Sequence, residues 1–269
     1  MIREARVTLD GRTTRYLEAG VGRPIVLLHA FPLNADMWRP QLARVPSGWR
    51  MVAPDLLGFG LSPRPFGSSP PTLDEAAGEV DGLMYALDIR TAVIVGLSMG
   101  GYVAFALFRR APHRFTGMIL ADTKAQADTQ EGRDGRRKMI ELAENTGARG
   151  VADQMLPKLL GTTTRQSRPE IADGVRVMIE AAPVAAIADA SRAMMGRPDS
   201  TADLAAVRCP VLVIVGEEDG ITPPADAAAI ARAIAGSRLV VLPAAGHLSS
   251  LEVPDAFSDA LSEFLRSEL

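Results

Sequence analysis

Short runs of β-branched and other apolar residues alternate with longer stretches of helical periodicity along most of this chain. Such alternation is typical of an α/β protein, because helices that connect parallel strands return the chain to the same end of the sheet. Several runs are continuously apolar, as expected of strands covered by helices on both faces. The runs predicted to be strands are residues 3–9, 13–19, 25–29, 50–53, 91–96, 116–121, 211–216 and 238–243. The expected fold is therefore α/β, with a mostly parallel, eight-stranded sheet and an N-terminal hairpin turned at Asp10 and Gly11.

The order of elements changes in the middle of the chain. Outside that region, helices are expected at residues 72–88, 99–111, 225–235 and 254–267. Inside it, helical patterns occur without strands, broken by Gly147, Gly161 and Pro183 and lying near residues 129–146, 150–160, 168–181 and 183–195. We therefore expect residues 1–122 and 204–269 to form one core domain and residues 123–203 to form an inserted helical cap.

Composition argues against several classes of partner and cofactor. The 29 Lys and Arg residues nearly balance the 32 Asp and Glu residues, so the net charge is −3. A nucleic-acid partner is not expected, because proteins that bind phosphates carry a surplus of cationic side chains. Cys209 is the only cysteine, which excludes an intramolecular disulfide. Together with the 3 histidines it does not resemble the ligand set of a structural zinc site. We expect no metal and no other cofactor.

The N-terminal residues argue against a secretory signal. Arg3, Glu4 and Arg6 occupy positions where such a signal needs apolar residues. No apolar run approaches the ~18 residues of a membrane-spanning helix. The sequence therefore predicts a cytoplasmic protein with no membrane partner.

The segment Gly96-Leu97-Ser98-Met99-Gly100 lies between a predicted strand and a predicted helix. A serine on so sharp a turn must adopt strained dihedral angles, and the residues two before and two after it must lack side chains for strand and helix to approach. Gly96 and Gly100 meet that requirement. The N-terminus of the following helix would direct its N–H groups and a partial positive charge at an oxyanion beside Ser98. The pattern indicates a nucleophilic serine.

With this segment, the sequence resembles the α/β-hydrolase family over nearly its whole length. The segment His29-Ala30-Phe31-Pro32 is similar to the oxyanion segment of that family, with Ala30 where a glycine is usual. The resemblance implies that the backbone N–H groups of Phe31 and Met99 form an oxyanion hole and that Trp38 lies near the substrate pocket. His29 itself is at least as well explained as a structural histidine.

A serine hydroxyl needs a base to take its proton and a third group to orient that base. His247 is the candidate base, since the segment Ala245-Gly246-His247-Leu248 resembles the histidine loop of the family and the unperturbed pKa of a histidine lies near working pH. Asp219 is the candidate acid, because it follows the seventh predicted strand. Ser98, Asp219 and His247 then occur in the chain order of the family.

Other carboxylates compete for the role of the acid. Glu218 is adjacent to Asp219, and Asp122 follows the sixth predicted strand, where some relatives place their acid. For Asp122, a capping or hinge role is the simpler interpretation. Asp55, which follows the fourth predicted strand, is expected to brace a loop by accepting hydrogen bonds.

These residues predict acyl transfer by a carboxylic ester hydrolase. Dehalogenases and epoxide hydrolases of this fold use an aspartate where this chain has Ser98. The motifs look most like those of bacterial serine carboxylesterases and 3-oxoadipate enol-lactonase-like hydrolases, and we expect esters of short to medium acyl chain as substrates. The alternatives are a lactonase, of 3-oxoadipate enol-lactone or acyl-homoserine lactone type, a perhydrolase, or a non-catalytic small-molecule receptor on the same fold.

The cap supplies apolar side chains that are candidates for the substrate pocket. Flexible thioethers suit an adaptable apolar lining, although packing against the sheet domain is the alternative for most of them. A dicarboxylic substrate would also need a cation in the pocket, for which the cap and its C-terminal end offer four arginines. The candidate lining residues are Met139, Met155, Leu159 and Met178, and the candidate cations are Arg165, Arg168, Arg192 and Arg197.

Overall fold

Eight strands form a single sheet in the order β1-β2-β4-β3-β5-β6-β7-β8 in the computed structural model, which describes residues 1–9, 11–63 and 70–269. β1 and β2 pair antiparallel, as do β2 and β4, and all other neighbours are parallel. The strands are β1 (Arg3–Leu9), β2 (Arg12–Gly20), β3 (Arg23–Leu28), β4 (Trp49–Pro54), β5 (Ala92–Leu97), β6 (Phe115–Ala121), β7 (Val211–Gly216) and β8 (Arg238–Leu242). The predicted fold class is confirmed; within the predicted hairpin turn, Asp10 lies outside the described residues.

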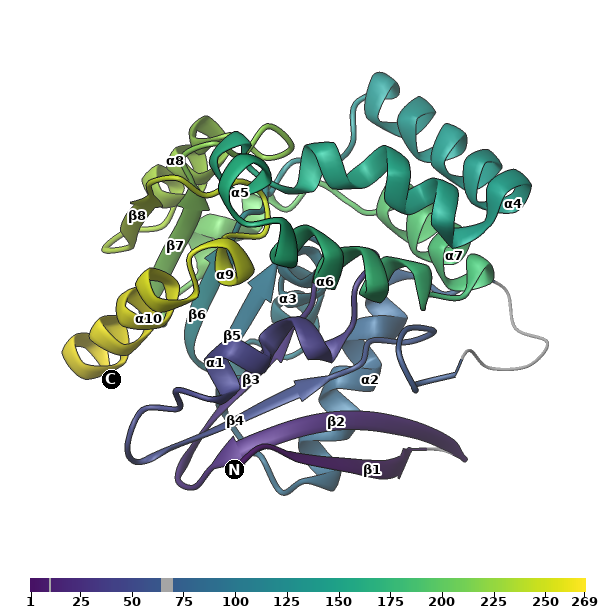
Figure 1. Cartoon of the computed structure of the whole chain (residues 1–269). Coiled ribbons are helices and arrows are strands. Elements are labelled where there is room, and N and C mark those ends of the chain that lie inside the picture. Colours follow the sequence, from purple (N-terminus) through teal and green to yellow (C-terminus); the bar gives the residue numbers. More distant parts are fainter. Residues whose placement is uncertain (10, 64–69) are drawn as a thin grey trace.

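Helices lie on both faces of this sheet (Figure 1). On one face α2 packs against α3, and α3 also contacts β3, β5 and β6; on the other face α1 contacts α10. The helices of the core are α1 (Arg39–Leu42), α2 (Leu73–Ala86), α3 (Met99–Arg110), α8 (Pro224–Ala233), α9 (Ser249–Glu252) and α10 (Pro254–Glu268), with 3₁₀ turns at Ala35–Trp38, Pro112–Arg114 and Thr201–Ala206.

Residues 123–203, which we call the cap, lie between β6 and β7 in the chain. They contain α4 (Gln130–Leu159), α5 (Thr162–Ser167), α6 (Pro169–Glu180) and α7 (Val184–Met195). Figure 1 shows these four helices gathered together over one end of the sheet. Gly147, with φ +71°, is not helical and divides α4 into two helical pieces, at the position where the sequence predicts a break. The short helix α5 is not among the predicted elements.

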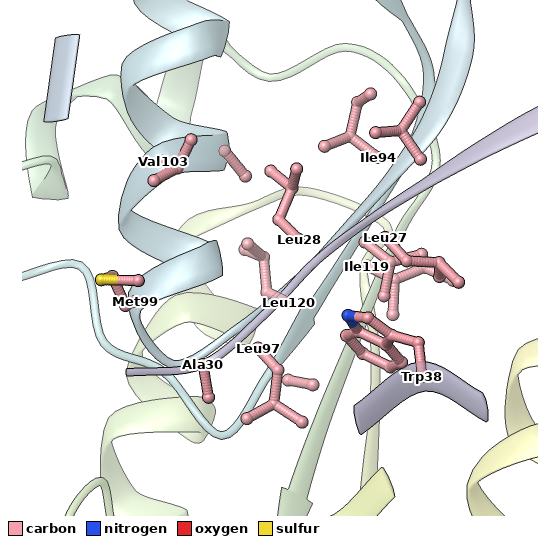
Figure 2. Close-up of a cluster of buried hydrophobic side chains, with 14 of the residues drawn as sticks. Leu27, Leu28, Ala30, Trp38, Ile94, Leu97, Met99, Val103, Ile119 and Leu120 are labelled. Atoms are coloured by element: carbon pink, nitrogen blue, oxygen red, sulfur yellow. The ribbon is translucent and has the colours of Figure 1, made fainter. Parts of the chain in front are cut away.

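The centre of the sheet is packed with apolar side chains from both sides. Every residue of β5 is buried, and Leu27, Leu28 and Ile94 have no exposed surface. Figure 2 shows this cluster, with Val103 of α3 at one side of the strands and Trp38 at the other. Burying one such side chain contributes about 1.5–3 kcal/mol relative to leaving it in water, so these strands are held firmly in the middle of the fold.

Two glycines allow β5 and α3 to meet at a very short distance. A Cβ atom added at Gly96 would lie 2.4 Å from the carbonyl oxygen of Gly100, and one added at Gly100 would lie 2.1 Å from the carbonyl oxygen of Leu28. Both contacts involve backbone atoms, which cannot rotate away. The start of α3 therefore rests directly on the carboxyl end of β3.

Substitution of Gly100 by alanine tests this packing. We expect Gly100→Ala to lower the free energy of unfolding by about 3 kcal/mol or more, because its methyl group collides with backbone in a buried position. Gly135→Ala is the matched control, since Gly135 is also helical and a Cβ there meets nothing within 4 Å; it should stabilise the protein by up to about 1 kcal/mol. Urea denaturation measures both, and equal stability of the two variants would contradict the argument.

Candidate active site

Ser98 is the single residue between the end of β5 and the start of α3. Its backbone has φ +55° and ψ −113°, a conformation that residues other than glycine adopt only when the surroundings enforce it. Its N–H donates to the carbonyl oxygen of Ala121 at 2.9 Å, and its own carbonyl oxygen accepts from Thr123 Oγ1 at 2.9 Å. The strained turn is thereby tied to the carboxyl end of β6, and the side chain remains partly exposed.

Three side chains from distant parts of the sequence form one hydrogen-bonded chain. His247 Nε2 lies 2.8 Å from Ser98 Oγ, and His247 Nδ1 lies 2.8 Å from Asp219 Oδ2. These residues follow β5, β7 and β8, whose parallel arrangement brings their carboxyl ends to the same edge of the sheet. Because a carboxylate can only accept, Nδ1 carries the proton and Nε2 is free to accept from the serine hydroxyl.

The carboxylate of Asp219 is held by a tight turn. Its Oδ1 accepts from the N–H groups of Ile221 and Thr222 at 2.8 and 3.0 Å, and its Oδ2 accepts from Thr222 Oγ1 at 2.7 Å. Thr222 Oγ1 also lies 3.2 Å from His247 Nδ1. Thr222 is a site residue that the sequence analysis missed; its position three residues after the acid in a Gly-Ile-Thr-Pro turn is the signal that could have identified it.

The electrostatics of this pair are governed by burial and by opposite charge. Burial raises the pKa of Asp219, but the charge and N–H of His247 and the donors of Thr222 outweigh it, so the pKa stays below its usual value. Burial lowers the pKa of His247, but the negative charges of Asp219, Asp122 and Glu252 outweigh it and raise the pKa above its usual value. The imidazolium is therefore stabilised by its surroundings.

The two competing carboxylates have other partners. Asp122 is fully buried and accepts from the N–H of Gly216 at 2.9 Å and from the Ser249 hydroxyl at 2.5 Å. Burial, followed by the charge of Asp219, raises its pKa to about 8. Glu218 accepts from the N–H and hydroxyl of Thr163 in the cap. Neither carboxylate is hydrogen-bonded to His247.

The N–H groups predicted for an oxyanion hole lie at two segments that are in contact. Gly100, next to Met99, rests on Leu28, which is followed closely by Phe31. Within the described part of the chain, neither the Phe31 N–H nor the Met99 N–H donates to another protein group. The helix α3 begins at Met99, so its dipole adds a partial positive charge at this point. These donors are available to a ligand.

Two neighbouring residues have structural roles. His29 is fully buried; its Nδ1 donates to the Ala30 carbonyl and its Nε2 accepts from the Leu56 N–H, each at 2.9 Å. Burial lowers the pKa of His29, and the two contacts fix the neutral ring. Asp55 accepts from the Ala35 N–H at 2.8 Å and braces the loop after β3.

Comparison with known proteins decides the family. A family model described as alpha/beta hydrolase fold matches residues 23–254. The chain belongs to the α/β-hydrolase family. Among solved structures of the family, the chain is similar to a malate-bound thermophilic esterase from Thermogutta terrifontis, at 38% identity and a TM-score of 0.93 over 98% of both chains.

Other proteins that resemble the chain are named for different activities. The enol-lactonase from Burkholderia xenovorans LB400 is 29% identical, with a TM-score of 0.90 over 98% of this chain and 100% of that one. The pimeloyl-[acyl-carrier protein] methyl ester esterase of Neisseria meningitidis is 29% identical over 272 residues, which cover 92% of this chain and 94% of that protein. Esterases and lactonases are thus both among the relatives of this α/β-hydrolase.

The residues predicted to line a pocket lie in several places. Leu159 is buried, and its carbonyl oxygen accepts from the His247 N–H at 3.0 Å. The side chains of Met139, Met155 and Met178 are partly buried and pack against the hydrophobic core. Trp38, expected near the pocket, has no exposed surface and lies beside Phe257 with ring centroids 5.9 Å apart. Figure 2 shows Trp38 in the core, on the far side of the cluster from Met99. Its large ring packs against Phe257 of α10.

A small apolar cavity lies beside the start of α3. Its volume is about 30 Å³, and its lining includes Leu57, Phe59, Met99, Val103, Ala190 and Ala193. These side chains come from the loop after β4, from α3 and from α7 of the cap. The lining also includes Leu73 and Ala76 of α2, so the cavity is a small apolar space between α2, α3 and the cap, and Ser98 and His247 do not line it.

The described residues contain neither a cluster of side chains suited to a metal ion nor a helix suited to a membrane. In residues 1–9, 11–63 and 70–269, no group of three or more His, Cys, Asp and Glu side chains is arranged to hold a metal ion. Over the same residues, none of the helices combines the length and apolar character needed to cross a membrane.

The buried carboxyl of Asp122 predicts a particular dependence of stability on pH. Its pKa is about 8 in the folded protein against an ordinary value of 3.8, so between about pH 4 and pH 8 the folded chain keeps a proton that the unfolded chain has released. The contribution of Asp122 to the free energy of unfolding therefore falls as pH rises, by at most about 1.4 kcal/mol per pH unit. Asp122→Asn should remove this part of the slope.

Urea denaturation between pH 5 and pH 8 measures this effect. Asp173→Asn is the matched control, because Asp173 is an exposed carboxylate on α6. Its removal should leave the dependence of the free energy of unfolding on pH the same as in the wild type. If Asp122→Asn and the wild type had parallel stability profiles, Asp122 would not be a neutral buried acid at pH 7.

Proposed function

We propose that this α/β-hydrolase is a carboxylesterase that cleaves esters of short to medium acyl chain through an acyl-enzyme intermediate. Ser98 is the nucleophile, His247 the general base and acid, and Asp219 the group that orients His247. The observation that carries the proposal is the continuous chain of 2.8 Å contacts from Ser98 Oγ through the His247 ring to Asp219. The N–H groups of Phe31 and Met99, which have no hydrogen-bond partner among the residues that the structure describes, support the same assignment.

The geometry supports a two-step reaction. As Ser98 Oγ bonds to the ester carbonyl carbon, its proton passes to His247 Nε2, and Phe31 and Met99 donate to the oxyanion. The bond from this carbon to the alcohol oxygen then breaks, and the alcohol oxygen takes the proton from Nε2. Water repeats the steps: it gives a proton to Nε2, its oxygen bonds to the acyl carbon, and Ser98 Oγ recovers the proton as the acid leaves.

The charges around the site favour an uncharged acyl group. Arg168 donates to the carbonyl of Glu252, Arg192 pairs with Asp189 and Glu144, and Arg197 is buried against Asp128. The side chain of Arg165 is exposed and contacts Thr162 in its own helix. Since these four arginines were the candidates for holding a second carboxylate, their other partners favour a neutral ester over a dicarboxylic enol-lactone.

Lactone hydrolysis is the second candidate. It uses the same attack on a carbonyl carbon, and the enol-lactonase from Burkholderia xenovorans is among the similar solved structures. Arg168, Arg192 and Arg197 already have other partners, which favours a substrate without a second carboxylate. We therefore place esters first and lactones second.

The proposal predicts steady turnover of p-nitrophenyl esters. Release of p-nitrophenol from the acetate and butyrate should continue well beyond one equivalent of enzyme, and kcat/KM should fall for long acyl chains. The Ser98→Ala variant should lose this activity. Several lactones measured beside the esters separate the two candidates: a kcat/KM higher for lactones than for every ester would reverse their order, and binding without turnover would indicate a receptor.

The acid assignment gives a second prediction about activity. Asp219→Asn should lower kcat by about 10⁴-fold if this site behaves like the serine-protease template, because an amide can hold the wrong tautomer of His247. Asp122→Asn is the matched control and should lower kcat far less, since Asp122 does not touch the imidazole. Steady-state kinetics on p-nitrophenyl butyrate measure both, and the reverse ranking would move the acid to Asp122.

A further inference from the structure

Glu252 is a buried carboxylate whose partners lie on both sides of His247. Its Oε1 accepts from the N–H groups of Gly246 and Leu248, at 3.0 and 3.1 Å, which are the residues immediately before and after His247. Its side chain has no exposed surface, although it belongs to the four-residue helix α9. A carboxylate in this position fixes the backbone on either side of the imidazole.

The second oxygen of Glu252 reaches the cap. Oε2 accepts from the N–H of Gly161 at 2.8 Å, at the junction between α4 and α5. A Cβ atom added at Gly246 would lie 2.2 Å from the Gly161 nitrogen, so the two loops are in direct backbone contact. The His247 N–H donates to Leu159 in the same junction, and Arg168 donates to the Glu252 carbonyl. One side chain therefore joins the cap to the loop that carries His247.

The charged groups near the His247 ring are mostly negative. Asp219 contacts it directly, and Asp122 and Glu252 act on it through space and raise its pKa against the effect of burial. Arg168 is held by the backbone of Glu252, and Glu218 is held by Thr163, outside the hydrogen-bonded chain. Removing the charge of Glu252 would leave the imidazolium less stabilised.

We propose that Glu252 is a positioning residue that holds the His247 ring against Ser98 and fastens the α4–α5 junction of the cap to the same loop. This inference rests on the proposed function, because it assigns Glu252 to the reaction in which His247 is the base. It differs from a purely structural role. A bracing residue alone would change stability, whereas a positioning residue changes kcat and the protonation of the imidazole without changing the binding of substrate.

Two substitutions separate the effect of the negative charge of Glu252 from the effect of its side-chain length. Glu252→Gln keeps the length of the side chain and an oxygen that can accept from the N–H groups of Gly246 and Leu248. It removes the negative charge, and it places an NH₂ donor against the Gly161 N–H, where no hydrogen bond can form. Glu252→Asp keeps the charge and shortens the side chain by one methylene. Glu218→Gln is the matched control, because the Glu218 side chain also holds the cap, through Thr163, whereas Glu218 contacts the histidine loop through its backbone N–H, which the substitution leaves in place.

The expected results differ between the variants. Glu252→Gln should lower kcat on p-nitrophenyl butyrate by about ten- to a hundredfold, with KM within about twofold, as expected for a small misplacement of a catalytic group. In the plot of kcat/KM against pH, the fall on the acid side (the acid limb) should move to lower pH in this variant. Without the negative charge of Glu252, the His247 imidazole stays neutral, and able to act as a base, down to a lower pH. Glu252→Asp should lower kcat while the acid limb stays near that of the wild type. In Glu218→Gln, kcat and the pH of the acid limb should both equal those of the wild type.

An NMR titration provides a readout that does not depend on turnover. The chain has 3 histidines, so the ring signals of His247 can be assigned by comparison with a His247→Gln variant and followed against pH. A lower pKa of His247 in Glu252→Gln supports the proposal even if no ester is cleaved, in which case only the proposed function fails. An unchanged His247 pKa together with an unchanged kcat, in a folded Glu252→Gln variant, would overturn it.

A third variant covers the case in which Glu252→Gln does not fold. Gly161→Ala leaves Glu252 in place but puts a methyl group 2.8 Å from the Gly246 nitrogen, which pushes the cap junction away from the histidine loop. We expect kcat to fall about tenfold with little change in the His247 pKa. A wild-type kcat in Gly161→Ala would show that the contact with the cap does not position the base.

Discussion

The reversal of the chain at Ser98 is the constraint on which the rest of the site depends. A single residue with φ +55° turns β5 into α3, and this is possible only because Gly96 and Gly100 let backbone touch backbone. The strain is offset by the buried strands on either side, in which apolar residues pack against helices on both faces of the sheet. The same turn presents the hydroxyl of Ser98 at the edge of the sheet and directs the first N–H of α3 to the adjacent space.

The carboxyl groups near His247 show how burial and hydrogen bonding give chemically similar groups different protonation states. Asp219 receives donors from Ile221, Thr222 and His247, so its pKa is lowered and it is ionised at neutral pH. Asp122, buried close to the charge of Asp219, has a pKa raised to about 8 and is mainly protonated at pH 7. Asp122 therefore adds its negative charge to the surroundings of His247 only in those molecules in which it is ionised, and Asp219 supplies the larger share of the charge that stabilises the imidazolium.

The sequence was sufficient to predict the eight strands and the fold because the central strands are short apolar runs bounded by turn residues and alternate with helical segments. It also identified Ser98, Asp219 and His247 as candidates, since the carboxyl ends of parallel strands meet at one edge. It could not assign Thr222 or Glu252, whose roles depend on which backbone N–H groups lie near their side chains after folding. Trp38 was expected at the pocket, but a large apolar ring is equally suited to the space beside Phe257, and only packing decides between them.

The cap is attached to the core by two different kinds of contact. On the histidine side the attachment is polar and directional, through Glu252, Gly161 and the Leu159 carbonyl. On the side of Met99, α7 meets the core through small apolar residues such as Ala190 and Ala193 around a cavity. Apolar contacts have no preferred direction, and on this side they are supplemented by a hydrogen bond from Arg109 of α3 to Ser200 and by Arg197, which lies over the Tyr102 ring. The hydrogen bonds that hold the loop carrying His247 are therefore separate from the contacts of α7, because Glu252 bonds to Gly246, Leu248 and Gly161 and to none of the residues around this cavity.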